Sequence, residues 1–303
     1  MNAGRFEVAI VGAGGVGGLL GALLIREGVD VRFVVTDATA SVLNSQGVRV
    51  RSKRYGNFAV PARAQTDLAS PVDICVVAVK AMHLEAAMER VPKPALANAV
   101  VVPFLNGVEH VDILRGLYGS AVVPGTVRVA SARSAPAVIE HSSPFMRVEI
   151  AVGDRENRSG QTVLTFAERL TSAGVDVDLR EDELSMLWGK LIFLCPLALL
   201  TTRYGIAAGD ARTLHRDELV AVITEIAAVA GALGASLSGD EALGFFDSVP
   251  VEMRSSMQHD AAAGNPIELD AIGGSVLRAG ERSGIPTPAT RQLVADLART
   301  AAP

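Results

Sequence analysis

The 303-residue sequence predicts an α/β domain built on a parallel, doubly wound sheet, followed by an all-α domain. Up to about residue 125, short Val- and Ile-rich segments alternate with helical segments, which is the pattern of a parallel sheet covered by helices. From Asp182 onward no further strand is predicted and helical periodicity continues to the end. We therefore expect two domains, over residues 1–180 and 181–303.

The composition is that of an ordinary globular protein, with 49% hydrophobic and 20% charged residues. A net charge of −5 gives no electrostatic case for binding nucleic acid. The only cysteines, Cys75 and Cys195, each lie in an apolar run, which excludes a disulfide framework or a Cys-rich zinc site and suits a reducing cytoplasm. The five histidines show no metal-ligand spacing, so we expect no metal.

Two apolar runs raise the question of a membrane span. Residues 8–25 carry no charge and reach the minimal length, but six of them are glycines, which break the apolar centre that a signal peptide needs. The run 191–200 is too short and is flanked by Lys190 and Arg203. We interpret both runs as core segments and expect no membrane association.

The elements of the first domain follow in order along the chain. The expected strands are 6–11, 29–35, 72–79, 99–103 and 121–123, with a hairpin or meander over 47–60 that turns at Gly56-Asn57. Expected helices follow the first strand up to Gly28 and cover 83–90 and 108–117. Extended segments with one helix near 160–173 occupy 126–179.

The second domain is expected to be entirely helical. Glycines and the Gly284-Ile285-Pro286 turn separate segments of helical periodicity at 183–203, 215–234, 239–246, 251–263, 266–284 and 288–300.

The strongest motif is a glycine-rich turn between the first strand and the first helix. It reads G-x-G-x-x-G and consists of Gly12, Ala13, Gly14, Gly15, Val16 and Gly17. In such a turn the first glycine permits the bend, the second lets the pyrophosphate approach and the third lets helix and strand pack closely. The helix N-terminus then offers free N–H groups to the phosphates. We expect a Rossmann-type dinucleotide-binding domain; the alternative is a glycine turn without a ligand.

The end of the second strand bears on the choice of cofactor. An acidic residue there binds the ribose 2′-hydroxyl of NAD, whereas a basic one suits the 2′-phosphate of NADP. The residues at this point are Thr36 and Asp37, and Asp37 follows Gly17 by 20 positions, about the expected interval. The alternative for Asp37 is a helix N-cap before Ala38.

Several fragments together resemble one family over essentially the whole chain. Besides the glycine turn they are Val79-Lys80-Ala81, Leu105-Asn106-Gly107, Leu187-Trp188-Gly189-Lys190-Leu191, Met253-Arg254-Ser255-Ser256-Met257 and Ile267-Glu268. They resemble the ketopantoate reductases (2-dehydropantoate 2-reductases). That resemblance implies an NADPH-dependent enzyme in which a Rossmann domain precedes a helical domain and the substrate binds between them.

The resemblance makes Lys190 the catalytic lysine. Reduction of a 2-keto acid adds hydride to the carbonyl carbon and leaves negative charge on the oxygen, which an ammonium group can stabilise and protonate. Lys190 is one of only four lysines, in a chain that otherwise uses Arg as its cation. The alternative is a lysine whose stem covers apolar surface while its charge reaches water.

Four other residues match family positions. The resemblance implies that Glu268 organises the lysine and the substrate, and that Ser256 lies near the substrate carboxylate. It implies that Asn106 contacts cofactor ribose and substrate, and that Lys80, at a strand end where open α/β sheets bind ligands, is a second active-site lysine. The alternatives without a role in catalysis are a surface carboxylate for Glu268, a helix-cap serine for Ser256, an Asn-Gly turn for Asn106 and a solvated cation for Lys80.

Three positions depart from the family pattern. Family members commonly have asparagines four and eight residues after the catalytic lysine, where this chain has Leu194 and Ala198. We expect these two residues to line a more apolar substrate wall. The family arginine for the 2′-phosphate falls on Thr36, although Arg51 and Arg54 follow on an extended segment and offer replacement cations.

We therefore expect a cytoplasmic reductase of a small 2-keto acid, ketopantoate or a close analogue, that uses NADP, with NAD as the alternative. A related dehydrogenase of a more apolar 2-oxo or 3-hydroxy acid is the alternative within the enzyme class. Outside that class the alternative is a catalytically silent dinucleotide-binding sensor, against which the retention of both Lys190 and Glu268 argues. The sequence leaves open whether the protein forms a homodimer.

Overall fold

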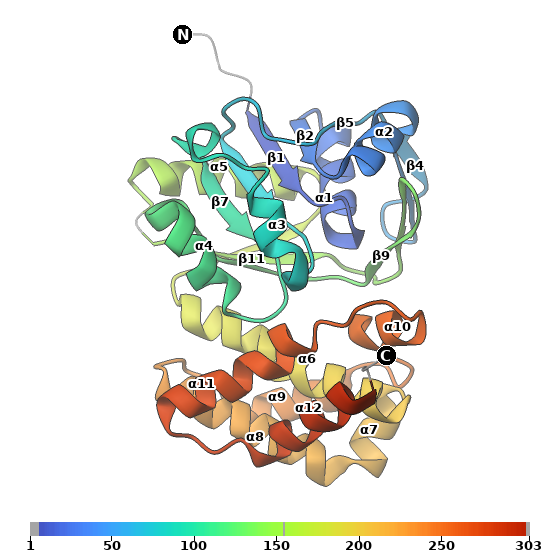
Figure 1. Ribbon diagram of the computed structural model, residues 1–303, viewed down its shortest axis with the longest axis vertical. Helices are drawn as coiled ribbons and strands as arrows, with labels where there is room; N and C mark the ends of the chain where they lie inside the picture. Colours follow the sequence, from blue (N-terminus) through green and yellow to red (C-terminus); the bar gives the residue numbers. More distant parts are fainter. Residues whose placement is uncertain (1–5, 154, 301–303) are drawn as a thin grey trace. The chain divides into compact units, whose positions relative to one another are not determined.

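The computed structural model describes residues 6–153 and 155–300 and divides the chain into two compact units (Figure 1). The first unit comprises Met1–Leu105 and His110–Glu181, and the second comprises Asn106–Glu109 and Asp182–Pro303. The segment 106–109, which the sequence places in the first domain, thus groups with the helices of the second unit.

The first unit is built around a five-stranded, wholly parallel sheet. In spatial order its strands are β5 (Arg63–Gln65), β2 (Asp30–Val34), β1 (Glu7–Val11), β6 (Ile74–Val77) and β7 (Val100–Pro103). Side chains of β1 alternate between two cores, with Val8 and Ile10 on one face of the sheet and Ala9 and Val11 on the other. The chain order reverses between β1 and β6, the type of point at which open α/β sheets bind ligands.

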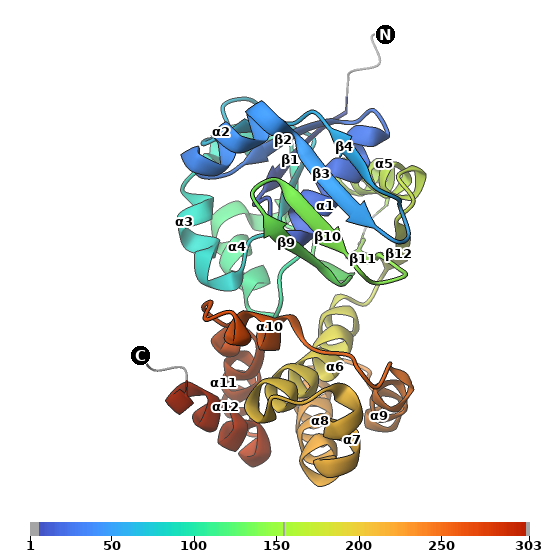
Figure 2. The same ribbon diagram turned by 90° about the vertical axis from the view of Figure 1, so that its right-hand side faces the viewer.

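Helix α1 (Gly15–Arg26) lies between this sheet and a second one (Figure 2). The second sheet has the order β4 (Phe58–Val60), β3 (Val48–Ser52), β10 (Val138–His141) and β9 (Ser131–Ala135). A Cβ added at Gly21 would lie 2.3 Å from the Phe33 ring on β2, and one at Gly18 would lie 2.6 Å from Ile139 on β10. The glycines of this apolar run therefore let two sheets pack closely on one helix.

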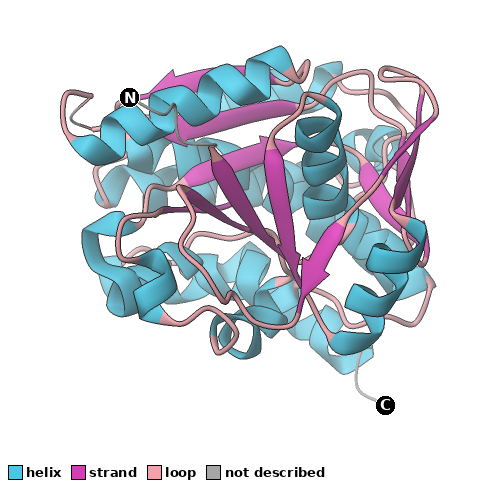
Figure 3. Ribbon diagram, turned by 90° about the horizontal axis from the view of Figure 1, so that it is seen from above, coloured by secondary structure: helices cyan, strands magenta, loops and turns pink. Residues whose placement is uncertain are grey.

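The remaining elements of the first unit complete its layers (Figure 3). They are helices α2 (Asp37–Gln46), α3 (Leu84–Met88), α4 (His110–Tyr118) and α5 (Arg158–Ser172), and a three-stranded sheet of β12 (Asp176–Arg180), β11 (Arg147–Ala151) and β8 (Gly125–Arg128). Three details differ from expectation. The segment 121–123 forms only one bridge, between Val122 and Val101. Helix α2 and the edge strand β5 are not among the elements predicted from the sequence.

The described part of the second unit contains helices and loops but no strand, as the sequence predicts. It contains α6 (Glu183–Tyr204), α7 (Ala208–Leu214), α8 (Arg216–Ala232), α9 (Gly239–Ser248), α10 (Ser256–Ala262), α11 (Ser275–Ser283) and α12 (Pro288–Thr300). Helix α6 packs against α8, α9, α10 and α12, which explains why it is apolar on most sides. The Asp182 side chain caps its start by accepting a hydrogen bond from the Ser185 N–H, and Gly205 ends it at a φ of 69°.

Two helical predictions are wrong in detail, and one helix is missed. The helix expected over 251–263 begins only at Ser256. The helix expected over 266–284 contains a π-helical turn, Asp270–Gly274, before α11. Helix α7 is not predicted, because the two glycines in its region are typical of breaks between helices.

Helix α6 is also long and apolar enough to span a membrane, although the apolar run considered within it is only ten residues long. In the structure, 72% of its most apolar 18-residue window is buried inside the protein. That burial is typical of the core helix of a globular unit.

Candidate active site

Each glycine of the motif has its own structural reason. Gly12 adopts a φ of 97°, donates its N–H to the Val34 carbonyl at 3.0 Å and has no space for a Cβ, which would lie 2.8 Å from Val79. A Cβ at Gly17 would lie 2.0 Å from the Gly12 carbonyl oxygen. At Gly14, by contrast, nothing lies within 4 Å of an added Cβ. The turn therefore bends and packs through Gly12 and Gly17 and leaves open space at Gly14.

The start of α1 is suited to an anion. Its N-cap residue is Gly14, which supplies no side-chain cap, and its first turn contains no acidic residue. The unsatisfied N–H groups and the positive end of the helix dipole therefore face the open space beside Gly14. These features fit the pyrophosphate of a nicotinamide dinucleotide, as the sequence predicts.

The rest of the turn is held against β9. The Ser131 hydroxyl donates a hydrogen bond of 2.9 Å to the Gly15 carbonyl, and a Cβ at Gly15 would lie only 2.1 Å from the Ser131 carbonyl oxygen. Ala13 is buried and Val16 is half-buried against the core of the first unit. Of these three predicted cofactor residues, Gly15 is the one that a backbone neighbour restricts to glycine.

Lys80 lies just beyond the end of β6, within the same unit as the glycine turn. It is the N-cap residue of a 3₁₀ turn, Ala81–His83. Two residues before it, the Ala78 carbonyl oxygen lies against Gly12, at 2.9 Å from the position of an added Cβ. The chain that carries Lys80 thus passes directly beside the predicted pyrophosphate site.

Thr36 and Asp37 lie at the start of α2 and are both exposed. Thr36 is the N-cap residue, and its hydroxyl donates to the Thr39 hydroxyl at 3.1 Å. Asp37 is the first helical residue, so the alternative of an N-cap role at Asp37 is wrong by one position.

The two replacement cations considered for a 2′-phosphate are engaged elsewhere. The Arg51 guanidinium pairs with Glu140 at 3.0 Å. Arg54 pairs with Asp176 at 2.9 Å and donates to the carbonyls of Pro144 and Gly174. The expectation that these arginines could reach the phosphate is therefore not supported.

The structure brings three predicted site residues together within the second unit. The Lys190 ammonium donates a hydrogen bond of 3.0 Å to Oδ1 of Asn106, and Nδ2 of Asn106 donates one of 2.8 Å to Oε2 of Glu268. An ammonium only donates and a carboxylate only accepts, so the Asn106 amide has a single orientation that satisfies both. The amide thus links the cation to the anion.

Different elements position these three side chains. Lys190 is half-buried in the first half of α6, and Glu268 is 9% exposed at the start of the segment that enters the π-helical turn. Asn106 is followed by Gly107, whose φ is 82° and whose added Cβ would lie 2.2 Å from the Ala271 carbonyl oxygen. Gly107 therefore lets the segment 106–109 lie directly on the π-helical turn.

Ser256 is exposed in the first turn of α10, next to the residue that caps the helix. The capping residue is Ser255, whose buried hydroxyl accepts from the Gln258 N–H at 3.0 Å and bonds the Thr201 hydroxyl at 2.9 Å. The capping role that was the alternative for Ser256 thus belongs to its neighbour.

Leu194 and Ala198 lie four and eight residues after Lys190 on α6. Leu194 is half-buried against the helical core. Ala198 has no exposed surface and belongs to that core. The expectation that Ala198 lines the substrate wall therefore needs correction, because its side chain is fully enclosed in the helical core.

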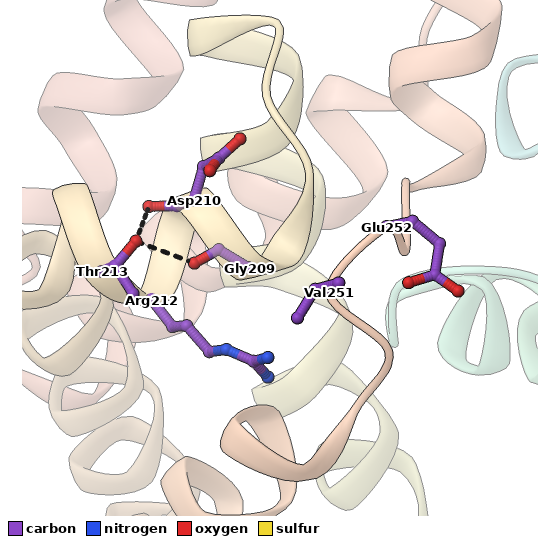
Figure 4. A pocket seen from close by; sticks show the side chains of 6 residues that line it. All are labelled: Gly209, Asp210, Arg212, Thr213, Val251 and Glu252. Atoms are coloured by element: carbon purple, nitrogen blue, oxygen red, sulfur yellow. Dashed lines mark hydrogen bonds between the residues drawn. The ribbon is translucent and has the colours of Figure 1, made fainter.

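A separate open pocket of about 420 Å³ lies on the second unit (Figure 4). It is lined by Gly209, Asp210, Arg212, Thr213, Val251 and Glu252. The Arg212 guanidinium is already bound to the carbonyls of Phe246, Asp247 and Val249, and thus fixes α7 to the end of α9. None of the predicted site residues lines this pocket. Among residues 6–153 and 155–300, no group of three or more His, Cys, Asp or Glu side chains could hold a metal ion.

Sequence reasoning missed the charged residues next to the Lys190–Asn106–Glu268 cluster. Glu109 is paired with Arg278, which also pairs with Asp270. The available signal was weak: an acidic residue three positions after Asn106, and arginines at 278 and 282 on one helix face.

Comparison with known proteins identifies the family. The profile described as "Ketopantoate reductase PanE/ApbA" matches residues 8–157, and the profile of the C-terminal part of the same family matches residues 182–300. A 2-dehydropantoate 2-reductase from Mycobacterium tuberculosis is 30% identical over 302 residues, which cover 96% of each chain. This chain belongs to the ketopantoate reductase family.

Solved structures of this ketopantoate reductase family share the fold. The 2-dehydropantoate 2-reductase of Geobacter metallireducens aligns with a TM-score of 0.86 at 25% identity, over 97% of this chain and all of that one. A PanE/ApbA family ketopantoate reductase from Ralstonia eutropha aligns with a TM-score of 0.86 at 28% identity, over 98% of each chain. The protein is accordingly an NAD(P)H-dependent oxidoreductase with a Rossmann-type first domain, and small keto acids are the substrates of its family.

Proposed function

We propose that this ketopantoate reductase family member reduces a small 2-keto acid with NADPH and that Lys190 is the proton donor. The observation that supports the proposal is the hydrogen-bonded chain from Lys190 through Asn106 to Glu268, at 3.0 and 2.8 Å. A lysine held in this way is restricted in position, as a general acid must be to reach a developing alkoxide.

The bound nicotinamide would supply the hydride that the substrate carbonyl carbon receives. As the C–H bond forms, the π electrons of the carbonyl move to its oxygen, and Lys190 Nζ hydrogen-bonds that oxygen and transfers a proton to it. Asn106 holds Nζ through its Oδ1, and Glu268 fixes the amide and balances the ammonium charge. The products are a 2-hydroxy acid, an oxidised nicotinamide and a neutral lysine, which regains its proton from solvent.

For the cofactor we propose NADP, as in the family, with NAD as the alternative. With Arg51 and Arg54 engaged elsewhere, the groups that favour a 2′-phosphate are the Thr36 hydroxyl and the N–H groups at the start of α2. The exposed carboxylate of Asp37 in the same turn opposes a phosphate and favours a 2′-hydroxyl.

Calorimetric titration of both cofactors tests this choice. Thr36→Arg should tighten NADPH binding by about 1.5–3 kcal/mol, the range for a hydrogen bond to a charged group, and leave NADH binding nearly unchanged. If the wild-type protein binds NADH at least about tenfold more tightly than NADPH, a gap of about 1.4 kcal/mol, the assignment of NADP is wrong and Asp37 becomes the specificity residue.

For the substrate we propose ketopantoate or a close analogue, and Leu194 supports a second candidate. This half-buried residue presents an apolar side chain one helical turn from Lys190, where the family commonly has an amide. A dehydrogenase of a more apolar 2-oxo or 3-hydroxy acid is therefore the alternative. Oxidation of NADPH and NADH across a panel of 2-keto acids distinguishes the two.

The same panel tests whether the protein turns over at all. A catalytically silent sensor would bind the dinucleotide and oxidise none, whereas the proposed reductase consumes one NADPH for each 2-hydroxy acid formed. We also infer a cytoplasmic location, supported by two cysteines that are free and buried rather than disulfide-bonded.

A further inference from the structure

An ion-pair cluster lies three residues along the chain from Asn106. Glu109 accepts hydrogen bonds from Arg278 Nε at 3.0 and 3.1 Å and from Arg278 Nη2 at 2.6 Å, and Arg282 approaches it at 3.5 Å. Arg278 Nη1 also donates to the Asp270 carboxylate at 2.6 Å. All four residues belong to the second unit. We refer to Glu109, Asp270, Arg278 and Arg282 as the anchoring cluster.

The cluster is one of three attachments between the segment 106–109 and the chain from Glu268 to Arg278. At the start of the segment, Asn106 donates to Glu268. In the middle, the Gly107 backbone lies on the Ala271 carbonyl. At the end, Glu109 binds Arg278. Because the segment has only four residues, at most about 10 Å of chain separates Glu109 from Asn106.

The π-helical turn makes room for this arrangement. A Cβ at Gly274 would lie 2.6 Å from the Asp270 carboxylate and 3.1 Å from Arg278 Nη1. Glycine at this position therefore lets Arg278 reach across the turn to Asp270 while its other nitrogens hold Glu109. Interruptions of this kind in a helix occur frequently at functional sites.

We propose that Glu109 and Arg278 are positioning residues for the reduction: they hold the segment 106–109 so that Asn106 stays within hydrogen-bond distance of both Lys190 and Glu268. The proposal rests on the proposed role of Lys190 as proton donor. Neither residue takes part in the chemistry itself.

The geometry of the pair suits this role. The planar guanidinium binds the carboxylate through two nitrogens, which fixes direction as well as distance. The Glu109 side chain is 26% exposed, so solvent screens this pair less than a fully exposed one. The hydrogen bond from Arg278 lowers the pKa of Glu109, which keeps the carboxylate ionised at neutral pH.

The first test compares Arg278→Gln and Glu109→Gln with a matched control. Arg291 and Glu281 form a more exposed ion pair of 2.9 Å between α12 and α11, outside the anchoring cluster, so Arg291→Gln removes an Arg–Glu contact of the same unit. We expect kcat to fall roughly 10- to 100-fold in the two cluster variants, the scale for a reacting group displaced by about 1 Å, and to stay at the wild-type value in the control. Unchanged kcat in both cluster variants, with or without a lower melting temperature, refutes the proposal.

The second test separates positioning from general stability. In an Asn106→Ala background the amide is absent, so Arg278→Gln should cause no further loss of kcat. Losses that multiply in the double variant refute the proposal. Arg278→Lys, which keeps the charge without the two-nitrogen contact, should recover part of the activity. If Arg278→Gln does not fold, Glu109→Gln, which preserves the side-chain shape, serves in the same cycle.

Lys190→Ala measured alongside distinguishes the two proposals. Wild-type activity in that variant refutes the proton-donor role. Loss of activity there, combined with unchanged kcat in the anchoring-cluster variants, refutes only the positioning role.

Discussion

Lys190→Met replaces the ammonium group with an uncharged side chain of similar length. The substitution removes the donor of the 3.0 Å hydrogen bond to Asn106, and with it the cation that Asn106 links to the Glu268 carboxylate, which is 9% exposed. We expect two consequences. The substrate oxygen loses its proton donor, and the Asn106 amide becomes free to rotate toward other partners.

The size of the effect follows from these losses. A positioned general acid contributes about 10²–10⁴-fold to kcat, which corresponds to about 2.7–5.4 kcal/mol of activation free energy. The hydrogen bond between Lys190 and Asn106 involves a charged group and stabilises the folded state by about 1.5–3 kcal/mol at most. The expected loss in kcat therefore exceeds what a weakened fold alone would cause at a temperature well below unfolding.

Lys190→Arg is the matched control for charge. Arginine keeps a cation near the alkoxide but does not give up its proton at any accessible pH. We expect it to restore part of the electrostatic stabilisation and none of the proton transfer, so that kcat of Lys190→Arg lies between that of Lys190→Met and that of the wild type.

Single-turnover oxidation of NADPH, followed at about 25 °C with a saturating 2-keto acid, separates the chemical step from cofactor binding and product release. Dissociation constants for NADPH, measured in the same samples, should be unchanged because the glycine turn belongs to the other unit. Near wild-type rates in Lys190→Met would refute the assignment of Lys190 as proton donor.

Three further outcomes are expected. Wild-type kcat/KM for analogues of ketopantoate that lack the hydroxyl should equal or exceed kcat/KM for ketopantoate itself. Leu194→Asn should reverse this preference, because a buried amide discriminates against substrates that lack the hydroxyl. A strong wild-type preference for ketopantoate would contradict the argument. Gly14→Ala should leave the melting temperature unchanged and weaken NADPH binding, because its Cβ enters the open space beside the start of α1. Gly15→Ala should lower the melting temperature, because its Cβ meets the Ser131 carbonyl oxygen at 2.1 Å. The reverse pattern in thermal melts and titrations would be inconsistent with the turn geometry. Burial lowers the pKa of His141, so the unfolded chain, with a histidine pKa of about 6.5, binds more protons than the folded one, and the stability of the fold decreases as pH falls through that value. The melting temperature of His141→Gln should therefore drop less between pH 7.5 and pH 5.5 than that of the wild type. An identical drop would exclude His141 as a source of the pH dependence.

The elements that the sequence predicts well are those whose pattern is local. Residues 8–11 of strand β1 and all of strand β6 are continuous apolar runs because both faces of the sheet are covered, and the glycine turn has a fixed spacing. Strand β5, by contrast, is three residues long and reads Arg-Ala-Gln, so neither length nor hydrophobicity marks it. It exists because its backbone pairs with β2.

At the candidate site, prediction from the sequence is limited for a similar reason. The sequence indicates Lys190, Asn106 and Glu268 individually through resemblance, but their hydrogen bonds join positions 84 and 162 residues apart, which no local pattern encodes. The pairing of Glu109 with Arg278 over 169 residues was missed for the same reason. The burial of Ala198 depends on the helices that pack around α6 and could not be deduced from its spacing after Lys190.

The grouping of Asn106–Glu109 with the second unit matters for anyone who recombines this protein with a relative. A fragment that begins at Asp182 contains Lys190 and Glu268 but not Asn106. It therefore lacks the residue that links Lys190 to Glu268, even if the fragment folds. A chimera joined at residues 181 and 182 takes Asn106 and Glu109 from one parent and Arg278 from the other. If Asn106, Glu109 and Arg278 have the roles proposed above, such hybrids should be active only when the two parents match at these positions, and a crossover that exchanges the four-residue segment together with the helices should avoid the conflict.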